Sequence, residues 1–354
     1  MTRARLRDLG IVIGSLNPGP WNAITDVPGV RVGYESVIED SPRVVRTGVT
    51  AIWPRESGIW NNPVFGGAHA FNGNGEVTGL AWVAEQGLIS APICLTNTNC
   101  VGTVRDAVCK LAVRSGASQL WHLPVVGETC DGLLSDPTAF AIDDATAFAA
   151  LDSASSGPLA EGNVGGGTGM VAHGFKGGTG TASRIVSAAD QYTVGVLVQA
   201  NYGERESLTI NGVPVGRKLS ADSIPILQAQ NRTDMGSIIV VLATDAPLLP
   251  IQCQRLARRA TIGLARAGGI GNNGSGDIFV AFSTANELAA TGNVHSVKML
   301  APDLLTPLFQ AAAEATEEAI LNALCGAESM TGYQERTAHA LPLDAVRSLV
   351  GPDS

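Results

Sequence analysis

Apolar residues in this chain form short runs separated by glycine-rich turns, a pattern typical of a protein built on β-sheets. The most continuous run covers 238–243, and its β-branched residues predict a strand buried on both faces. Further strands are expected at 10–13, 30–32, 50–53, 92–96, 123–126, 192–200 and 276–283. Residues 54–79 are rich in Gly and Asn and are predicted to form a loop of the kind that often serves a site.

Helical spacing of apolar residues marks several segments between and after these strands. Val104, Ala107, Val108 and Leu111 predict an amphipathic helix over 101–114. Other helices are expected over 79–86, 143–153, 247–267, 303–323 and 343–350. Many strands combined with late helices indicate an α/β protein, and 354 residues suffice for one large domain or two ordinary ones.

Composition and charge narrow the possible partners. A hydrophobic content of 45% permits a sizeable core, and a net charge of −9 argues against binding to nucleic acid or to an anionic membrane. No stretch is long and apolar enough to span a bilayer, and the basic N-terminus lacks an apolar core of signal-peptide length. We therefore expect a cytoplasmic protein.

No motif in the sequence predicts a metal or another cofactor. The six cysteines contain no Cys-x-x-Cys pair, and the five histidines contain no His-Glu-x-x-His. Residues 269–274 spell Gly-x-Gly-x-x-Gly, but this stretch follows a predicted helix and precedes a strand, the reverse of the dinucleotide-binding order. Nucleotide binding is therefore not expected.

Ser237 lies where a polar linker, 220–235, meets the buried strand. In one interpretation it simply begins the strand. In the other, Ser237 is a nucleophile released by cleavage of its own bond to Gly236, whose glycine would permit a strained turn. The α-amine of a new N-terminal residue titrates near ~7.7–8.0. That amine could serve as a base beside its own hydroxyl at neutral pH.

The sequence at 236–250, Gly-Ser-Ile-Ile-Val-Val-Leu-Ala-Thr-Asp-Ala-Pro-Leu-Leu-Pro, resembles the L-aminopeptidase/D-esterase–amidase and β-peptidyl aminopeptidase family. Blocks at 22–33, 72–79, 174–184, 198–203 and 275–282 extend the resemblance over nearly the whole chain. It implies a four-layer α/β/β/α sandwich of two mixed sheets flanked by helices. It also implies a single domain, 1–354, which cuts itself into an α chain, 1–236, and a β chain, 237–354, and assembles as a homotetramer.

The resemblance also implies roles for particular residues. The family's second serine and its acidic partner correspond to Ser275 and Asp277, which strand alternation places on one face. Its oxyanion donor corresponds to Asn201, and the acid that receives the free amine of the substrate corresponds to Glu128. Relatives often have Tyr where this chain has Cys130, which argues against a phenol-assisted step.

The resemblance implies an aminopeptidase that releases N-terminal residues from small peptides, amides or esters of L-, D- or β-amino acids. The catalytic base stays open between the α-amine of Ser237 and a relay in which Asp277 orients Ser275 and Ser275 orients Ser237. One alternative function is a self-cleaving hydrolase of ω-amino acid oligoamides, which would not need Glu128 at a short fixed distance. The other is an acyl-transferring or non-catalytic relative with the same fold.

Overall fold

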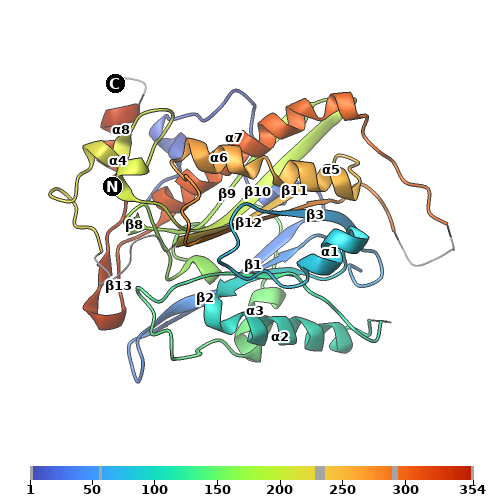
Figure 1. Ribbon diagram of the computed structural model, residues 1–354, viewed down its shortest axis with the longest axis horizontal. Coiled ribbons are helices and arrows are strands. Elements are labelled where there is room, and N and C mark those ends of the chain that lie inside the picture. Colours follow the sequence, from blue (N-terminus) through green and yellow to red (C-terminus); the bar gives the residue numbers. More distant parts are fainter. Residues whose placement is uncertain (1–2, 56–57, 118, 228–235, 289–293, 352–354) are drawn as a thin grey trace.

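The computed structural model arranges two sheets and their helices in four layers, and it describes residues 3–55, 58–117, 119–227, 236–288 and 294–351 (Figure 1). The strands are β1 (Arg31–Glu39), β2 (Val45–Trp53), β3 (Val64–Ala70), β4 (Leu88–Ile89), β5 (Ile93–Asn97), β6 (Val126–Thr129), β7 (Val171–Ala172), β8 (Phe175–Lys176), β9 (Gly178–Ser187), β10 (Gln191–Asn201), β11 (Gly236–Thr244), β12 (Ser275–Ser283), β13 (Met330–Thr331) and β14 (Thr337–Ala338). The α-helices are α1 (Leu80–Gln86), α2 (Val101–Arg114), α3 (Asp144–Asp152), α4 (Val215–Lys218), α5 (Pro250–Ala257), α6 (Ala260–Arg266), α7 (Thr306–Gly326) and α8 (Leu343–Val350).

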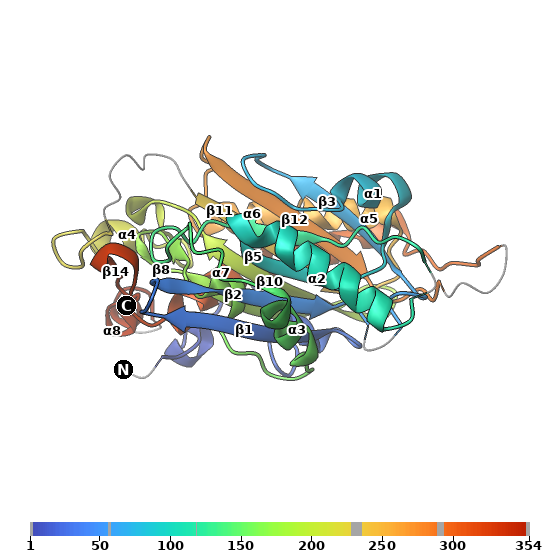
Figure 2. The ribbon, with the colours of Figure 1, turned by 90° about the horizontal axis from the view of Figure 1, so that it is seen from below.

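The two main sheets pack face to face with helices outside both. One sheet has the order β4-β3-β12-β11-β10-β9 and the other the order β1-β2-β5-β6. Helices α5, α6 and α7 cover the outer face of the six-stranded sheet, and α2 and α3 cover the four-stranded sheet (Figures 1 and 2). The expected α/β/β/α sandwich of mixed sheets is confirmed.

Strand β11 lies at the centre of the six-stranded sheet, antiparallel to β10 and parallel to β12. Ile238, Val240 and Leu242 point into the core beneath the helices, and Ile239, Val241 and Ala243 into the core between the sheets. The prediction of a strand buried on both faces is therefore confirmed. Residues 228–235 of the preceding linker lie outside the described residues.

Some sequence-based expectations about secondary structure were wrong. The predicted loop over 54–79 contains strand β3. Residues 11–13 follow a short 3-10 helix (Leu6–Leu9) and form no strand; they are apolar because Ile11 and Ile13 pack into the core beneath the helices. The helix expected over 247–267 divides into α5 and α6, and the long late helix begins at Thr306 instead of Asp303.

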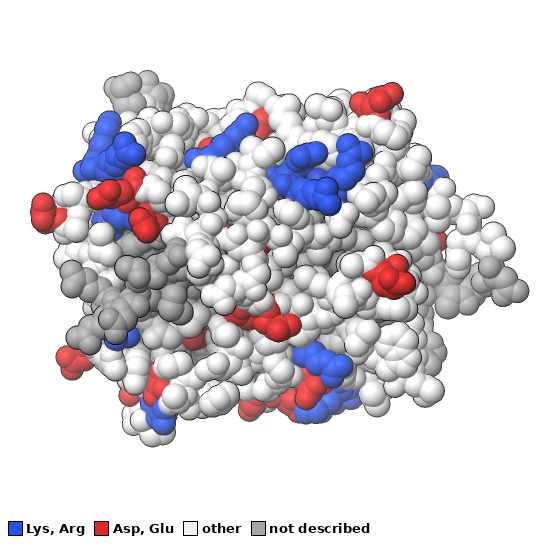
Figure 3. Space-filling model, in the orientation of Figure 1, with Lys and Arg blue, Asp and Glu red and all other residues white. Residues whose placement is uncertain are grey.

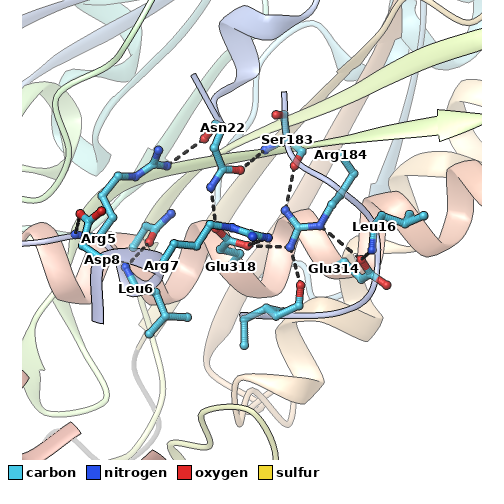
Figure 4. Close-up of polar contacts among 12 residues, drawn as sticks. Arg5, Leu6, Arg7, Asp8, Leu16, Asn22, Ser183, Arg184, Glu314 and Glu318 are labelled. Carbon is cyan, nitrogen blue, oxygen red and sulfur yellow. Dashed lines mark hydrogen bonds and ion pairs between the residues drawn. The ribbon is translucent and has the colours of Figure 1, made fainter. Parts of the chain in front are cut away.

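A buried network of charged side chains fastens the N-terminal segment and β9 to α7 (Figure 4). The Arg184 guanidinium donates to the carboxylates of Glu318 at 2.6 Å and Glu314 at 3.2 Å. Arg7 and Asn22 also donate to Glu318, at 2.8 and 2.5 Å. The side chains of Arg184 and Glu318 are fully buried. The network thus joins segments that precede residue 236 to a helix that follows it.

The surface carries both signs of charge in small groups. On the face drawn in Figure 3, Lys and Arg form a few small groups, and Asp and Glu form others, over a largely uncharged surface. Within the described ranges, no helix has both the length and the apolar character needed to cross a bilayer. The same ranges contain no cluster of three or more His, Cys, Asp or Glu side chains able to hold a metal ion.

Candidate active site

Ser237 is the second residue of β11, at the end of the strand that faces a cavity between the sheets. In the parallel register of β11 and β12 it lies opposite Gly276, whose N–H donates to Ser237 Oγ at 3.1 Å. Because side chains alternate along a strand, Ser237 shares the inter-sheet face with Ile239. Ser237 as a whole residue is only 8% exposed, and it lines this cavity.

Gly236 is the first residue of β11 and is confined by its neighbours. A Cβ atom built on it would lie 2.9 Å from Tyr202 Cα and 3.0 Å from Asn201 O. Close packing against β10 therefore explains the glycine at this position.

Ser275 and Asp277 form a hydrogen-bonded pair on β12, with Ser275 Oγ donating to Asp277 Oδ1 at 2.6 Å. Both side chains point to the helix-covered face of the sheet, as Phe279 does farther along the strand. Burial raises the pKa of Asp277, while hydrogen bonds from the Ser275 hydroxyl and the Ile238 N–H oppose this rise.

The pair and the Ser237 hydroxyl therefore lie on opposite faces of the sheet. Ser275 and Asp277 line a second cavity, of about 390 Å³, and Gly236 lines both cavities. No hydrogen bond joins the Ser275 and Ser237 hydroxyls within the described part of the chain. The backbone around the Gly236–Ser237 bond thus lies between the Ser237 hydroxyl on one face and the Ser275–Asp277 pair on the other.

Asn201 lies directly opposite Ser237 in the antiparallel register of β10 and β11, so both side chains share one face. Its Oδ1 accepts from the Val171 N–H at 2.9 Å, and its Nδ2 donates to Cys130 O at 2.9 Å. These two partners fix the orientation of the amide. The second N–H of Nδ2 is then available to a ligand in the cavity.

Glu128 lies on β6 of the other sheet, is only 3% exposed, and lines the same cavity as Ser237 and Asn201. The cavity measures about 430 Å³, and the described residues that line it include no Lys, Arg or His. One carboxylate oxygen accepts the Glu76 N–H at 2.9 Å and the other accepts the Thr98 hydroxyl. Burial raises the pKa of Glu128 despite these hydrogen bonds. Its carboxylate therefore has no cationic partner in the described ranges, and a ligand ammonium could supply one.

The sequence reasoning missed the residues that hold these functional groups in place. Asn72 Nδ2 donates to Asp277 Oδ2 at 3.1 Å, and Thr98 and the Glu76 N–H hold Glu128. Only the Asn- and Gly-rich composition around Asn72 hinted at such a role, because such loops often serve a site. Nothing in the sequence distinguishes Thr98 from a surface threonine.

Comparison with known proteins places this geometry among aminopeptidases. Residues 22–338 match peptidase family S58. The chain is 47% identical to the beta-peptidyl aminopeptidase BapA of Sphingosinicella microcystinivorans, over 98% of this chain and 91% of that protein. The solved structure of a Burkholderia sp. beta-aminopeptidase matches with a TM-score of 0.91 and 47% identity, covering 98% of this chain and 99% of that one.

A second solved structure links the fold to a mechanism class. The L-aminopeptidase D-Ala-esterase/amidase of Ochrobactrum anthropi, described as a prototype for the serine aminopeptidases and a variant among the Ntn hydrolase fold, matches with a TM-score of 0.91. The two chains are 44% identical, and the match covers 98% of this chain and 97% of that one. Similarity of this extent defines a serine hydrolase with an Ntn-hydrolase-like fold. The chain belongs to peptidase family S58 and is a serine aminopeptidase, as its resemblance predicted.

Proposed function

We propose that the chain cuts its own Gly236–Ser237 bond and then uses Ser237 as an N-terminal nucleophile against small peptides, amides or esters that carry a free amine. The observation that carries this proposal is one cavity lined by Ser237, by Asn201 and by Glu128, a carboxylate with no cation beside it in the described ranges. In this proposal, domain 1–354 matures into chains 1–236 and 237–354.

The proposed cut is an acyl shift followed by hydrolysis. Ser237 Oγ attacks the carbonyl carbon of Gly236, the C–N bond breaks, and the hydroxyl proton passes to the nitrogen of residue 237. Water then hydrolyses the resulting ester, leaving a carboxylate on Gly236 and a free hydroxyl and α-amine on Ser237. Substrate amides follow the same two steps, with an acyl-enzyme formed on Oγ.

Each neighbour then has a role. Glu128 pairs with the ammonium of the substrate, and the free N–H of Asn201 donates to the oxyanion, a kind of contact whose loss costs about 10²–10³ in turnover. The Ser275–Asp277 pair supports the α-amine of Ser237, which takes the proton from the hydroxyl. Placement of the pair on the opposite face of the sheet favours this base over a direct hydroxyl-to-hydroxyl relay.

The acyl half of the substrate is proposed to be a β-aminoacyl group, with L- and D-aminoacyl groups as competitors. The beta-peptidyl and beta-aminopeptidase relatives, each aligned over 98% of this chain, support this choice. A panel of p-nitroanilides of β-Ala, L-Ala and D-Ala ranks the three classes. Faster transfer of the acyl group to an added amine than to water would favour the acyltransferase alternative. Preferential cleavage of ω-amino acid oligoamides would favour the alternative of a self-cleaving oligoamide hydrolase.

The test of the proposed function starts from purified protein on a denaturing gel. We expect two fragments split after residue 236, the smaller one beginning Ser-Ile-Ile, and an uncut, inactive chain for Ser237→Ala. A full-length chain that hydrolyses the panel would refute the cleavage, and a cut chain that hydrolyses no member would refute the aminopeptidase assignment to this cavity.

A homotetramer of cut protomers, which the family resemblance supports, and a cytoplasmic location complete the proposal. Light scattering on the purified, cut protein measures the assembly, and a mass other than that of four protomers would refute it. Fractionation of the source cells tests the location.

A further inference from the structure

Residues 71–76, which we call the strap, donate hydrogen bonds to Asp277 at one end and to Glu128 at the other. At one end the N–H groups of Phe71 and Asn72 donate to Asp277 O at 2.9 and 3.3 Å, and Asn72 Nδ2 donates to the Asp277 carboxylate at 3.1 Å. At the other end the Glu76 N–H donates to Glu128 Oε1 at 2.9 Å. One short segment therefore positions two carboxylates that come from different sheets.

The middle of the strap packs against the start of β12, the strand paired with the one that carries Ser237. Asn74 donates from its backbone to Ser275 O at 3.2 Å and from its side chain to Gly274 O at 2.8 Å. A Cβ atom on Gly276 would lie 2.6 Å from Asn74 O and 2.7 Å from Gly75 Cα, so only glycine fits there. Because the Gly276 N–H donates to Ser237 Oγ, the strap is one residue away from the nucleophile.

We propose that the strap is the specificity-determining element of this site: it fixes the separation between Glu128 and Ser237 and thereby selects the length of the aminoacyl group. The inference rests on the function proposed above. A β-aminoacyl group has one more methylene between its amine and its carbonyl than an α-aminoacyl group. One methylene in a fitted site discriminates about 10–200-fold between substrates.

Two glycines in the strap provide a matched pair of variants. A methyl group on Gly75 would lie 3.3 Å from Glu128 Oε1 and 3.1 Å from Gly276 Cα, contacts that require a shift of a few tenths of an ångström. A methyl group on Gly73 would meet no atom within 4 Å. Neither glycine has a left-handed φ. Gly75→Ala and Gly73→Ala therefore stiffen the same loop, but only Gly75→Ala narrows the space beside Glu128.

The measurement is the ratio of kcat/KM for β-alanyl-p-nitroanilide to that for L-alanyl-p-nitroanilide. Any loss of folded or cut protein cancels in this ratio. We expect Gly75→Ala to lower the ratio about tenfold, because the longer acyl group loses its space, and Gly73→Ala to keep it within twofold. A ratio in Gly75→Ala within twofold of the unaltered protein would overturn the inference. Absence of hydrolysis of both substrates by the unaltered protein would instead overturn the proposed function.

Two further variants distinguish the effect of the strap on substrate preference from the effects of other contacts to Asp277 and Glu128. Asn72→Ala removes the hydrogen bonds from Asn72 Nδ2 to the Asp277 carboxylate and to Asn272 O, and leaves the contact between Glu76 and Glu128 in place. We therefore expect kcat to fall about tenfold on both substrates with the ratio unchanged. Thr98→Val removes the other hydrogen bond to Glu128, and should raise KM for both substrates equally because the strap still holds the carboxylate. A change of ratio in Thr98→Val without one in Gly75→Ala would show that Thr98 sets the position of Glu128, which contradicts the inference.

Discussion

Replacing Glu318 by Gln should destabilise the fold strongly, because both oxygens of this buried carboxylate accept hydrogen bonds from Arg7, Asn22 or Arg184. One oxygen accepts from Arg7 at 2.8 Å and Asn22 at 2.5 Å, and the other from Arg184 at 2.6 Å and Arg7 at 3.0 Å. Whichever way the Gln amide turns, its NH₂ group faces donors, and the buried Arg184 keeps only Glu314 as a carboxylate partner.

The expected cost follows from the burial of the pair. Removing one partner of a buried ion pair costs about 3–5 kcal/mol. Unfolding entropy near 60 °C is about 2.1 cal/mol/K per residue, hence about 740 cal/mol/K for 354 residues, so each kcal/mol lowers Tm by about 1.3 °C. Glu318→Gln should therefore lower Tm by about 4–7 °C.

The penalty should depend on pH in a defined direction. Burial alone would raise the pKa of Glu318, but Arg184 and Arg7 outweigh it, so the pKa is lowered in the folded state. A carboxyl group of this kind contributes stability that is present above its unfolded pKa and lost as the pH falls through its folded pKa. The stability difference between Glu318→Gln and the unaltered chain should therefore shrink below pH of about 4.3.

Urea unfolding followed by circular dichroism measures this difference at pH 7 and at successively lower pH. The variant is compared in a Ser237→Ala background, so that chain cleavage does not enter. Glu85→Gln is the matched control, because Glu85 is exposed and forms no ion pair within the described ranges, and it should change stability by less than about 0.5 kcal/mol. A Glu318→Gln penalty below about 1 kcal/mol at pH 7, or one independent of pH, would refute the reasoning.

The remaining predictions concern catalysis. Glu128→Gln should lower kcat/KM for free-amine substrates at least about 30-fold, mainly through KM, since a buried charge pair is lost. Equal cleavage of free and N-acetylated substrates by the unaltered enzyme would exclude the role of Glu128 in binding the substrate amine. Because burial raises the pKa of Glu128, kcat/KM should fall on acidification at a higher pH than an ordinary glutamate would cause, and the Gln variant should lack that step. Ser275→Ala and Asp277→Asn should each reduce turnover per cut protomer about 10²–10⁴-fold, and the double variant little further. Near-normal turnover in Ser275→Ala would remove the pair from the mechanism.

The hydrophobic pattern predicts strands in which bulky β-branched residues fill the core. It does not predict strands in which glycines lie directly under a helix. Strand β11 is of the first kind and was predicted. Strand β9 begins Gly-Thr-Gly-Thr because α7 lies directly on it, and a Cβ atom on Gly180 would lie 2.1 Å from Ala319 O. In β3, a Cβ atom on Gly67 would lie 2.4 Å from the Gln254 nitrogen in α5. Close helix contact selects these glycines, and no local pattern shows it.

For the site, spacing alone placed Ser275 and Asp277 on one face, and the hydrogen bond between them agrees with that prediction. The positions of Asn201 and Glu128 beside Ser237 could be expected only from the family resemblance, because they depend on how β10 and β6 meet β11 in space. The relation between Ser275 and Ser237 depends on the register of two strands that are separated by two helices in the chain. A one-residue slip in that register would reverse the face, and sequence alone does not set it.

The register of β11 and β12 explains why the proposed cleavage would be needed for catalysis. The Ser237 hydroxyl faces Asn201 and Glu128, whereas Ser275 and Asp277 face the helices, and no hydrogen bond joins the two serine hydroxyls in the described ranges. The backbone nitrogen of residue 237 lies in the plane of the sheet, between the two faces. In an intact chain that nitrogen belongs to an amide, whose lone pair is delocalised and not basic. Cleavage would turn it into an amine with a pKa near ~7.7–8.0, tetrahedral and able to reach both faces. The base would then be made by the same reaction that frees the nucleophile, and an uncut chain would stay inactive even with every side chain in place.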